Sequence, residues 1–258
     1  MIAMHAPFDL TRDVVTGGPG GIGLGMARAL LASGAGVAIW GSNPDKTERA
    51  RTALAADCSD AARVHAFACD VGDQAQVEST FEASVRALGR ADACLANAGV
   101  SSKGAPLPEL TLEELRRVQR VDVQGVFLTF RAAARHMAQR GQGGSLVATA
   151  SAAAIDGAPR NSHGTFKSAV TPMVRALAVE LAWHRIRVNS ILPGWIVTDM
   201  TEKTVADRKF AEAVLPRIPA RRWGEAADFG GIAVDLASQA SAHATGEQFV
   251  VDGGDTKF

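Results

Sequence analysis

The chain has no tyrosine among its 258 residues and only three cysteines, Cys58, Cys69 and Cys94. Because their number is odd and their spacing fits no metal site, we expect reduced thiols, no bound metal and a cytoplasmic protein. The sequence has no apolar run of membrane-spanning length and no signal-peptide pattern, so we expect no membrane association. Lys plus Arg and Asp plus Glu balance at 27 each, so the basic field that nucleic-acid binding needs is missing.

Short apolar runs alternate with segments of helical period. Strands are expected at 37–40, 64–69, 93–96, 144–151 and 186–191, with a last strand within 248–254, and helices at 47–56, 74–88, 112–137, 169–183 and 226–238. An earlier strand should be short, because Arg12 and Asp13 leave only Val14 and Val15 as a clear apolar pair. The alternation predicts an α/β fold with one doubly wound parallel sheet, helices on both faces and ligands at the carboxyl ends of the strands.

A glycine-rich loop joins the first strand to a helix-patterned segment. Such a turn leaves the first N–H groups of the helix unpaired, and with the helix dipole they can seat a phosphate. The alternative is a glycine-rich turn without a ligand. The residues of this candidate site are Gly17, Pro19, Gly20, Gly21, Ile22 and Gly23.

The pattern Thr-Gly-x-x-x-Gly-Ile-Gly resembles that of the short-chain dehydrogenase/reductase family, and the resemblance extends from Thr16 to Gly254. Further matches are Asn97-Ala98-Gly99, Ser151, Lys167, Pro193-Gly194 and the Val-Asp-Gly-Gly ending. The resemblance implies a Rossmann fold, a homotetramer, and an NAD(P)-dependent oxidoreductase that interconverts an alcohol and a ketone. It also implies one domain over 1–258, with a cofactor half at about 12–110, a catalytic half at about 111–258 and a lid at about 199–220.

Several residues at strand ends should contact the cofactor in view of this resemblance. Gly41 stands where an acid usually selects NAD, and Ser42, Asn43 and Lys46 could receive a 2′-phosphate, which favours NADP slightly. A plain turn that selects neither cofactor is the alternative. The remaining residues expected at the cofactor are Asp70, Val71, Asn97, Ala98, Gly99, Lys167, Pro193, Gly194, Ile196 and Thr198. Asp70 could equally cap the helix that follows it.

The catalytic residues implied by the resemblance are Ser151, which would hydrogen-bond the substrate oxygen, and Lys167, which would bind the nicotinamide ribose. The family has asparagine where Asp122 stands, holding a helix bend and a water of the proton relay. An ionised Asp122 could accept the same hydrogen bonds but could not donate them. A buried or bend-capping carboxylate without a relay role is an equally good interpretation.

His163 occupies the position, four residues before Lys167, where the family has its proton-donating tyrosine. Imidazole can do acid–base work, but it is shorter than phenol, and a neighbouring lysine disfavours its protonated form. Three interpretations stay open: His163 is a weaker acid, the chain binds cofactor with little turnover, or tyrosine was exchanged for histidine in this sequence. His184 and His243 also stand where relatives often have tyrosine, which favours the third. A cofactor-binding sensor or scaffold is therefore the alternative function. Beside the expected lid, Trp195, Met200 and Phe210 are candidate walls of the substrate pocket, and core packing is equally plausible for each.

Overall fold

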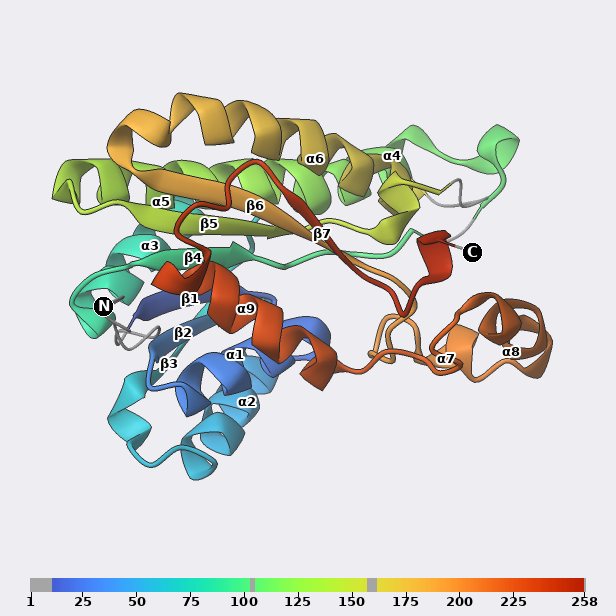
Figure 1. The fold of residues 1–258 in the computed structure, drawn as a ribbon, viewed down its shortest axis with the longest axis horizontal. Coiled ribbons are helices and arrows are strands. Elements are labelled where there is room, and N and C mark those ends of the chain that lie inside the picture. Colours follow the sequence, from blue (N-terminus) through green and yellow to red (C-terminus); the bar gives the residue numbers. More distant parts are fainter. Residues whose placement is uncertain (1–10, 103–104, 157–161, 258) are drawn as a thin grey trace, which may run out of the picture.

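The structure, a computed structural model, describes residues 11–102, 105–156 and 162–257, but not the side chains of residues 162, 163 and 165. Seven parallel strands form one sheet in the order β3-β2-β1-β4-β5-β6-β7 (Figure 1). The strands are β1 Arg12–Thr16, β2 Gly36–Gly41, β3 Val64–Ala68, β4 Ala93–Ala96, β5 Gly144–Thr149, β6 Ile186–Pro193 and β7 Gln248–Val251.

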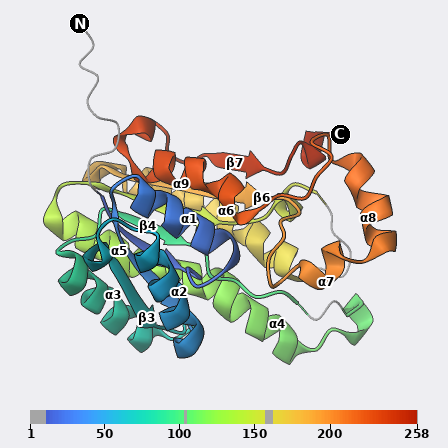
Figure 2. The same ribbon diagram turned by 90° about the horizontal axis from the view of Figure 1, so that it is seen from below.

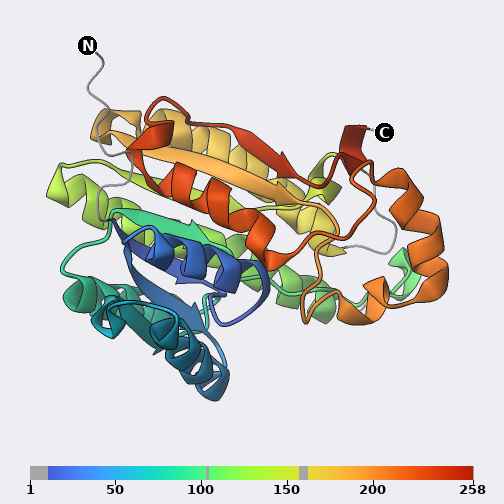
Figure 3. The same ribbon diagram turned by 60° about the horizontal axis from the view of Figure 1, so that its bottom comes forward.

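Helices cover both faces of this sheet, which confirms the predicted doubly wound architecture. One face carries α1 Gly21–Ala32, α2 Pro44–Ala56 and α9 Gly230–Ala237, and the other carries α3 Gln74–Leu88, α5 Gly125–Arg140 and α6 Ser162–Glu180 (Figures 1 and 3). Each face has its own apolar core, one centred on residues such as Ile39 and Leu95, the other on Phe81 and Leu146.

Three short helices lie at the end of the sheet where the strands point. They are α4 Leu112–Gln119, α7 Glu202–Val205 and α8 Arg208–Val214. Helices α7 and α8, in the segment predicted to be a lid, stand beyond the carboxyl ends of the strands, away from the layered body (Figure 2). The segments that follow β1, β4, β5 and β6 therefore lie at the end of the sheet near these helices.

The expectation of a short first strand was wrong. β1 runs over five residues, Arg12–Thr16, and pairs with β2 on one side and β4 on the other. Asp13 lies inside it and is fully buried, with its register partners Val37 and Ala93. The backbone ladder and the apolar neighbours hold the strand in place although a carboxyl group interrupts its apolar pattern.

The single helix expected over 112–137 is instead two helices joined by a π-helical turn, Arg120–Gln124. This wider turn contains Asp122 and is the type of helix irregularity that occurs often at functional sites. The helix expected from residue 169 begins seven residues earlier, at Ser162, so it also includes positions 163 and 167. Among the described residues, no helix is both long and apolar enough to cross a membrane.

Candidate cofactor and active site

The glycine loop folds as a sharp connection from β1 into α1. Gly17 adopts φ 67°, a conformation that favours glycine. At Gly23 a Cβ atom would stand 2.4 Å from the carbonyl oxygen of Gly17, so no side chain fits there. Gly20 is the N-cap of α1 and offers no side chain to its first N–H groups. The loop, with Pro19, Gly21 and Ile22, therefore presents backbone donors at a helix N-terminus, as a phosphate site requires.

Asn97 ties together the ends of three strands next to this loop. Its Nδ2 donates to the carbonyl oxygen of Thr16 at 3.2 Å, and its Oδ1 accepts from the hydroxyl of Thr149 at 3.1 Å. Thr16 Oγ1 in turn accepts the N–H groups of Asn97 and Ala98, each at 3.0 Å. These bonds fix the carboxyl ends of β1, β4 and β5 and place Ala98 and Gly99 beside the catalytic candidates.

The turn after β2 has no space for the acid that NAD selection usually employs. A Cβ on Gly41 would stand 2.4 Å from Thr47 Oγ1 and 2.5 Å from Pro19 Cγ. Ser42 is exposed, and Asn43 caps α2 by accepting the N–H of Lys46 at 2.8 Å. Lys46 follows this turn, and its ammonium lies over the glycine loop, 2.9 Å from where a Cβ on Gly20 would be.

Asp70 does not cap the helix that follows it, so that alternative was wrong. Asp73 is the N-cap of α3 and accepts the N–H of Gln76 at 3.0 Å. The Asp70 carboxylate instead accepts from Arg120 at 2.7 Å and from the N–H of Gly72 at 2.9 Å, while Val71 is buried. Arg120 was not foreseen, because the contact joins residues 50 positions apart without a recognisable local pattern.

Lys167 is 2% exposed, and its ammonium donates to the carbonyl oxygen of Thr149 at 2.7 Å. Burial lowers the pKa of Lys167 from its ordinary value, and the negative charge of Asp122 opposes that shift. Asp122 is fully buried in the π-helical turn, and its Oδ1 accepts the N–H of Val100 at 2.8 Å. Both charged groups lie against Gly99, where a Cβ would be 3.2 Å from Asp122 Oδ1 and 3.3 Å from Lys167 Nζ.

Two substitutions of Asp122 should separate its charge from its role as an acceptor. Asp122→Asn keeps an acceptor for Val100 but removes the charge that supports the ammonium, so we expect the pKa of Lys167 to fall. Asp122→Ala also removes the acceptor and should cost about 1–3 kcal/mol of unfolding free energy. NMR titration of lysine side chains and urea unfolding measure the two effects; an unchanged Lys167 pKa in Asp122→Asn would contradict the electrostatic link.

Ser151 follows the end of β5 on the same side of the sheet as Lys167. It is the N-cap of a short 3₁₀ turn, and its Oγ accepts the N–H of Ala153 at 3.2 Å. Since the hydroxyl accepts this bond, its proton can still be donated to a substrate oxygen. Ser145, at the other end of β5, is buried and donates to the carbonyl oxygen of Leu236 at 2.7 Å.

His163 is the second residue of α6, one helical turn before Lys167. Its side chain lies outside the described part of the structure. Residues i and i+4 share a helix face, so the backbone places position 163 on the side of α6 that carries Lys167. His184 and His243 are exposed.

The segment after β6 returns toward the glycine loop. Gly194 leaves no room for a side chain, because its Cβ would stand 2.7 Å from that of Asp252, in the Val-Asp-Gly-Gly ending. The hydroxyl of Thr201 donates to the Ile196 carbonyl and accepts the N–H of Thr198, the latter at 3.0 Å. Thr198 Cγ2 lies 3.0 Å from where a Cβ on Gly21 would be. Pro193 to Thr198 thus lies directly across from the N-terminus of α1.

Aromatic side chains connect this segment to α8. Trp195 packs edge-on against Phe210 of α8, with ring centroids 4.8 Å apart. Phe210 stacks on Trp223 at 6.0 Å. Trp223 was missed as a wall candidate, since nothing in its local sequence shows that it meets α8. Met200, the third predicted wall residue, is 45% exposed.

Comparison with known proteins gives consistent matches over nearly the whole chain. A family model described as enoyl-(acyl carrier protein) reductase matches residues 18–256. Gluconate 5-dehydrogenase of Gluconobacter oxydans is 34% identical over 248 residues, 95% of this chain and 94% of the relative. L-rhamnose 1-dehydrogenase (NAD(P)(+)) of Azotobacter vinelandii is 32% identical, covering 93% and 94%. A solved short-chain type dehydrogenase/reductase from Mycobacterium marinum superimposes with a TM-score of 0.89 at 35% identity, covering 97% of both chains.

Proposed function

Because the chain belongs to the short-chain dehydrogenase/reductase family, we propose that it is an NAD(P)-dependent oxidoreductase that interconverts an alcohol and a ketone. The observation that carries the proposal is the buried ammonium of Lys167, held on Thr149 at the same sheet edge as Ser151 and the glycine loop. A protein that only senses a dinucleotide has no need of a serine aimed at a substrate oxygen.

The residues present fit a nicotinamide dinucleotide. The uncapped N-terminus of α1 would seat the pyrophosphate, Asp70 and Val71 would meet the adenine, and Asn97 to Gly99 would line the ribose. Pro193, Gly194, Ile196 and Thr198 would hold the carboxamide across from α1. When bound, the nicotinamide supplies the hydride acceptor or donor.

Within this arrangement each catalytic side chain has a separate task. Ser151 would donate its hydroxyl proton to the carbonyl oxygen of the substrate and so orient it. Lys167 would bind the nicotinamide ribose with its ammonium. His163 would give a proton to the oxygen during reduction and remove it during oxidation, and Asp122 would hold the π-helical turn beside Lys167.

The finer features of this proposal rest on particular residues. Position 41 has no room for the acidic side chain that would repel a 2′-phosphate, and Lys46 supplies a positive charge nearby. Both features favour NADP(H) over NAD(H). The relatives named for gluconate and L-rhamnose suggest a small hydroxylated substrate, which Trp195 and Phe210 could contact under the lid. A homotetramer is the assembly that the family resemblance implies. We place the protein in the cytoplasm and assign it no metal, membrane or nucleic-acid partner.

The second candidate is a dinucleotide-binding sensor or scaffold of the same fold. Histidine at position 163 and aspartate at position 122 favour it, because neither is the residue that the family uses there. The two candidates predict the same cofactor binding but different turnover.

Consumption of NADPH and NADH with a panel of keto sugars, keto acids and cyclic ketones tests the proposal. The expected result is turnover of at least one carbonyl that is lost in Lys167→Ala. Binding of either cofactor without turnover of any carbonyl would favour the sensor.

A further inference from the structure

An ion pair joins the cofactor-binding turn to the start of the lid. Lys46, in the first turn of α2, places its Nζ 2.5 Å from Oδ2 of Asp199, which is 153 positions later in the chain. Their side chains are 42% and 79% exposed, so both can be reached from solvent. The carboxylate accepts a hydrogen bond from the ammonium, and this contact lowers the pKa of Asp199 from its ordinary value.

The pair stands directly over the glycine loop. A Cβ on Gly20, the N-cap of α1, would lie 2.9 Å from Lys46 Nζ and 3.8 Å from Asp199 Oδ2. The ammonium thus occupies the space that a side chain at position 20 would fill. Helix α2 thus places a positive charge over the loop, where the loop itself carries no side chain.

The turn between β2 and α2 offers no acidic side chain that could oppose a phosphate near this ammonium. Gly41 has no room for an acid that would hold ribose hydroxyls and repel a 2′-phosphate. Lys46 projects from the helix that follows this turn, and Asn43 fixes the start of that helix by accepting the Lys46 N–H. A phosphate on the adenosine ribose would therefore meet one cation and no opposing carboxylate from β2.

Lys46 already stands in the proposed function as the cation that favours the 2′-phosphate of NADP(H); we propose that Asp199 occupies Lys46 until that phosphate replaces it. This inference rests on the proposed function, since it assigns a task to two residues of the same cofactor site. A carboxylate and a phosphate compete for one ammonium, so the ion pair lowers the affinity for NADP(H) and leaves that for NAD(H) nearly unchanged.

The exchange also links the cofactor to the lid. Asp199 follows Thr198, which lies against Gly21, and precedes α7 by three residues. When a phosphate takes Lys46, Asp199 no longer ties the start of the lid to α2. NADP(H) should consequently loosen this connection, whereas NAD(H) should leave it in place.

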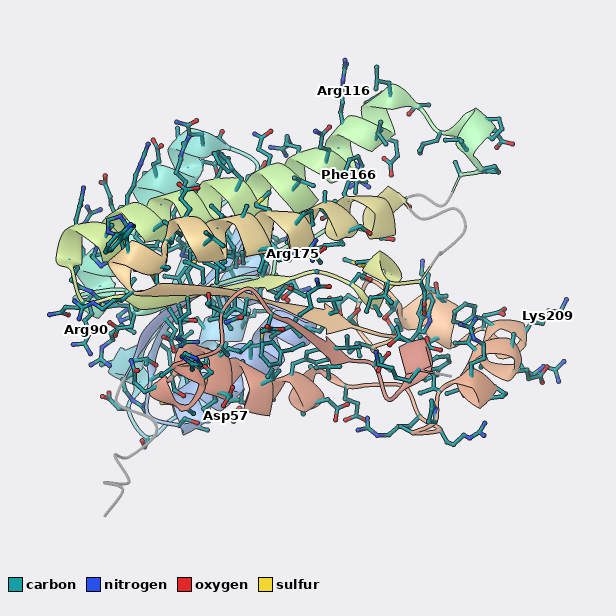
Figure 4. The ribbon with its side chains drawn as sticks, turned by 45° about the horizontal axis from the view of Figure 1, so that its top comes forward. Asp57, Arg90, Arg116, Phe166, Arg175 and Lys209 are labelled. Carbon is teal, nitrogen blue, oxygen red and sulfur yellow. The ribbon has the colours of Figure 1, made fainter. Side chains whose placement is uncertain are left out.

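Fluorescence titration of the full-length protein with NADP⁺ and NAD⁺ tests the inference without requiring turnover. Lys46→Met should weaken NADP⁺ binding about tenfold or more and change NAD⁺ binding less than twofold. Asp199→Asn should strengthen NADP⁺ binding severalfold, and Lys46→Met with Asp199→Asn should bind like Lys46→Met alone. Lys209→Met and Glu202→Gln, exposed lid residues with the same charge changes, are the controls; Figure 4 shows Lys209 projecting from α8.

Equal loss for both cofactors in Lys46→Met would assign the lysine to the pyrophosphate and overturn the inference. Unchanged NADP⁺ affinity in Asp199→Asn would overturn the competition between carboxylate and phosphate. If the unsubstituted protein binds neither cofactor, the proposed function fails first, so the two failures are distinguishable.

Discussion

Replacing Asp13 with valine is expected to stabilise the protein at pH 8 by about 3–5 kcal/mol, which corresponds to roughly 10 °C in Tm for a chain of this size. The carboxyl group is fully buried in β1 between two paired strands. Its Oδ2 accepts a hydrogen bond from the Thr11 hydroxyl at 2.8 Å. Its Oδ1 has no hydrogen-bond partner among the described residues.

The cost of this carboxyl group depends on pH. Burial raises the pKa of Asp13 from 3.8 to about 8, the nearby charge of Asp92 adds to the shift, and the Thr11 bond opposes it. The folded state therefore holds a proton that the unfolded state loses above about pH 4. Stability from this group is fully present below pH 4 and is lost as the pH rises toward 8.

Urea unfolding at pH 5 and pH 8 measures this effect. The unsubstituted protein should lose stability between the two values, and Asp13→Val should lose much less. Asp57→Asn removes one charge from an exposed carboxylate that pairs with Arg28, so it controls for net charge. An Asp13→Val variant with the same loss of stability between pH 5 and pH 8 as the parent would rule out this explanation.

His163→Tyr is expected to raise kcat for carbonyl reduction by about 100-fold, since a placement error of roughly 1 Å costs about that much. Position 163 lies one turn before Lys167 on α6. A tyrosine there would extend farther than imidazole toward a substrate held by Ser151. The ammonium of Lys167 would also lower the phenol pKa, whereas it disfavours the imidazolium that His163 needs to act as an acid.

Two other histidines provide matched controls for this variant. His184→Tyr and His243→Tyr make the same exchange at exposed positions outside the predicted site and should leave kcat unchanged. If His163→Tyr is no faster than the parent, histidine is already an adequate acid, and the argument from side-chain length fails.

The sequence predicted the layers of the fold and the edge of the sheet at which the candidate site residues lie. Apolar runs separated by helix-period segments predicted a parallel sheet, and the glycine loop indicated where its first strand ends. The helix over 74–88 and the strand over 93–96 lie where periodicity placed them, because their burial follows the local pattern. Ser151 and Lys167 were found by resemblance, and the structure brings them to one edge.

Features that depend on long-range contacts could not be predicted in this way. The burial of Asp13 is set by β2 and β4, and its own strand gives no sign that a charge there is tolerated. Hydrophobic periodicity gave no sign of the π-helical turn at Asp122, because the turn keeps the polarity of an ordinary helix; only the family resemblance indicated a bend there. The pairs Lys46–Asp199 and Arg120–Asp70 join surface charges far apart in the chain, and many such charges have no fixed partner.

The most direct test of the central claim is isotope transfer from NADPH and NADH deuterated at either face of nicotinamide C4, using the carbonyls of the panel. The account predicts that the unsubstituted protein delivers deuterium to the carbonyl carbon from one face only, and that Lys167→Ala delivers none. Cofactor binding without deuterium in any product, in the parent and in His163→Tyr alike, would contradict the assignment as an oxidoreductase.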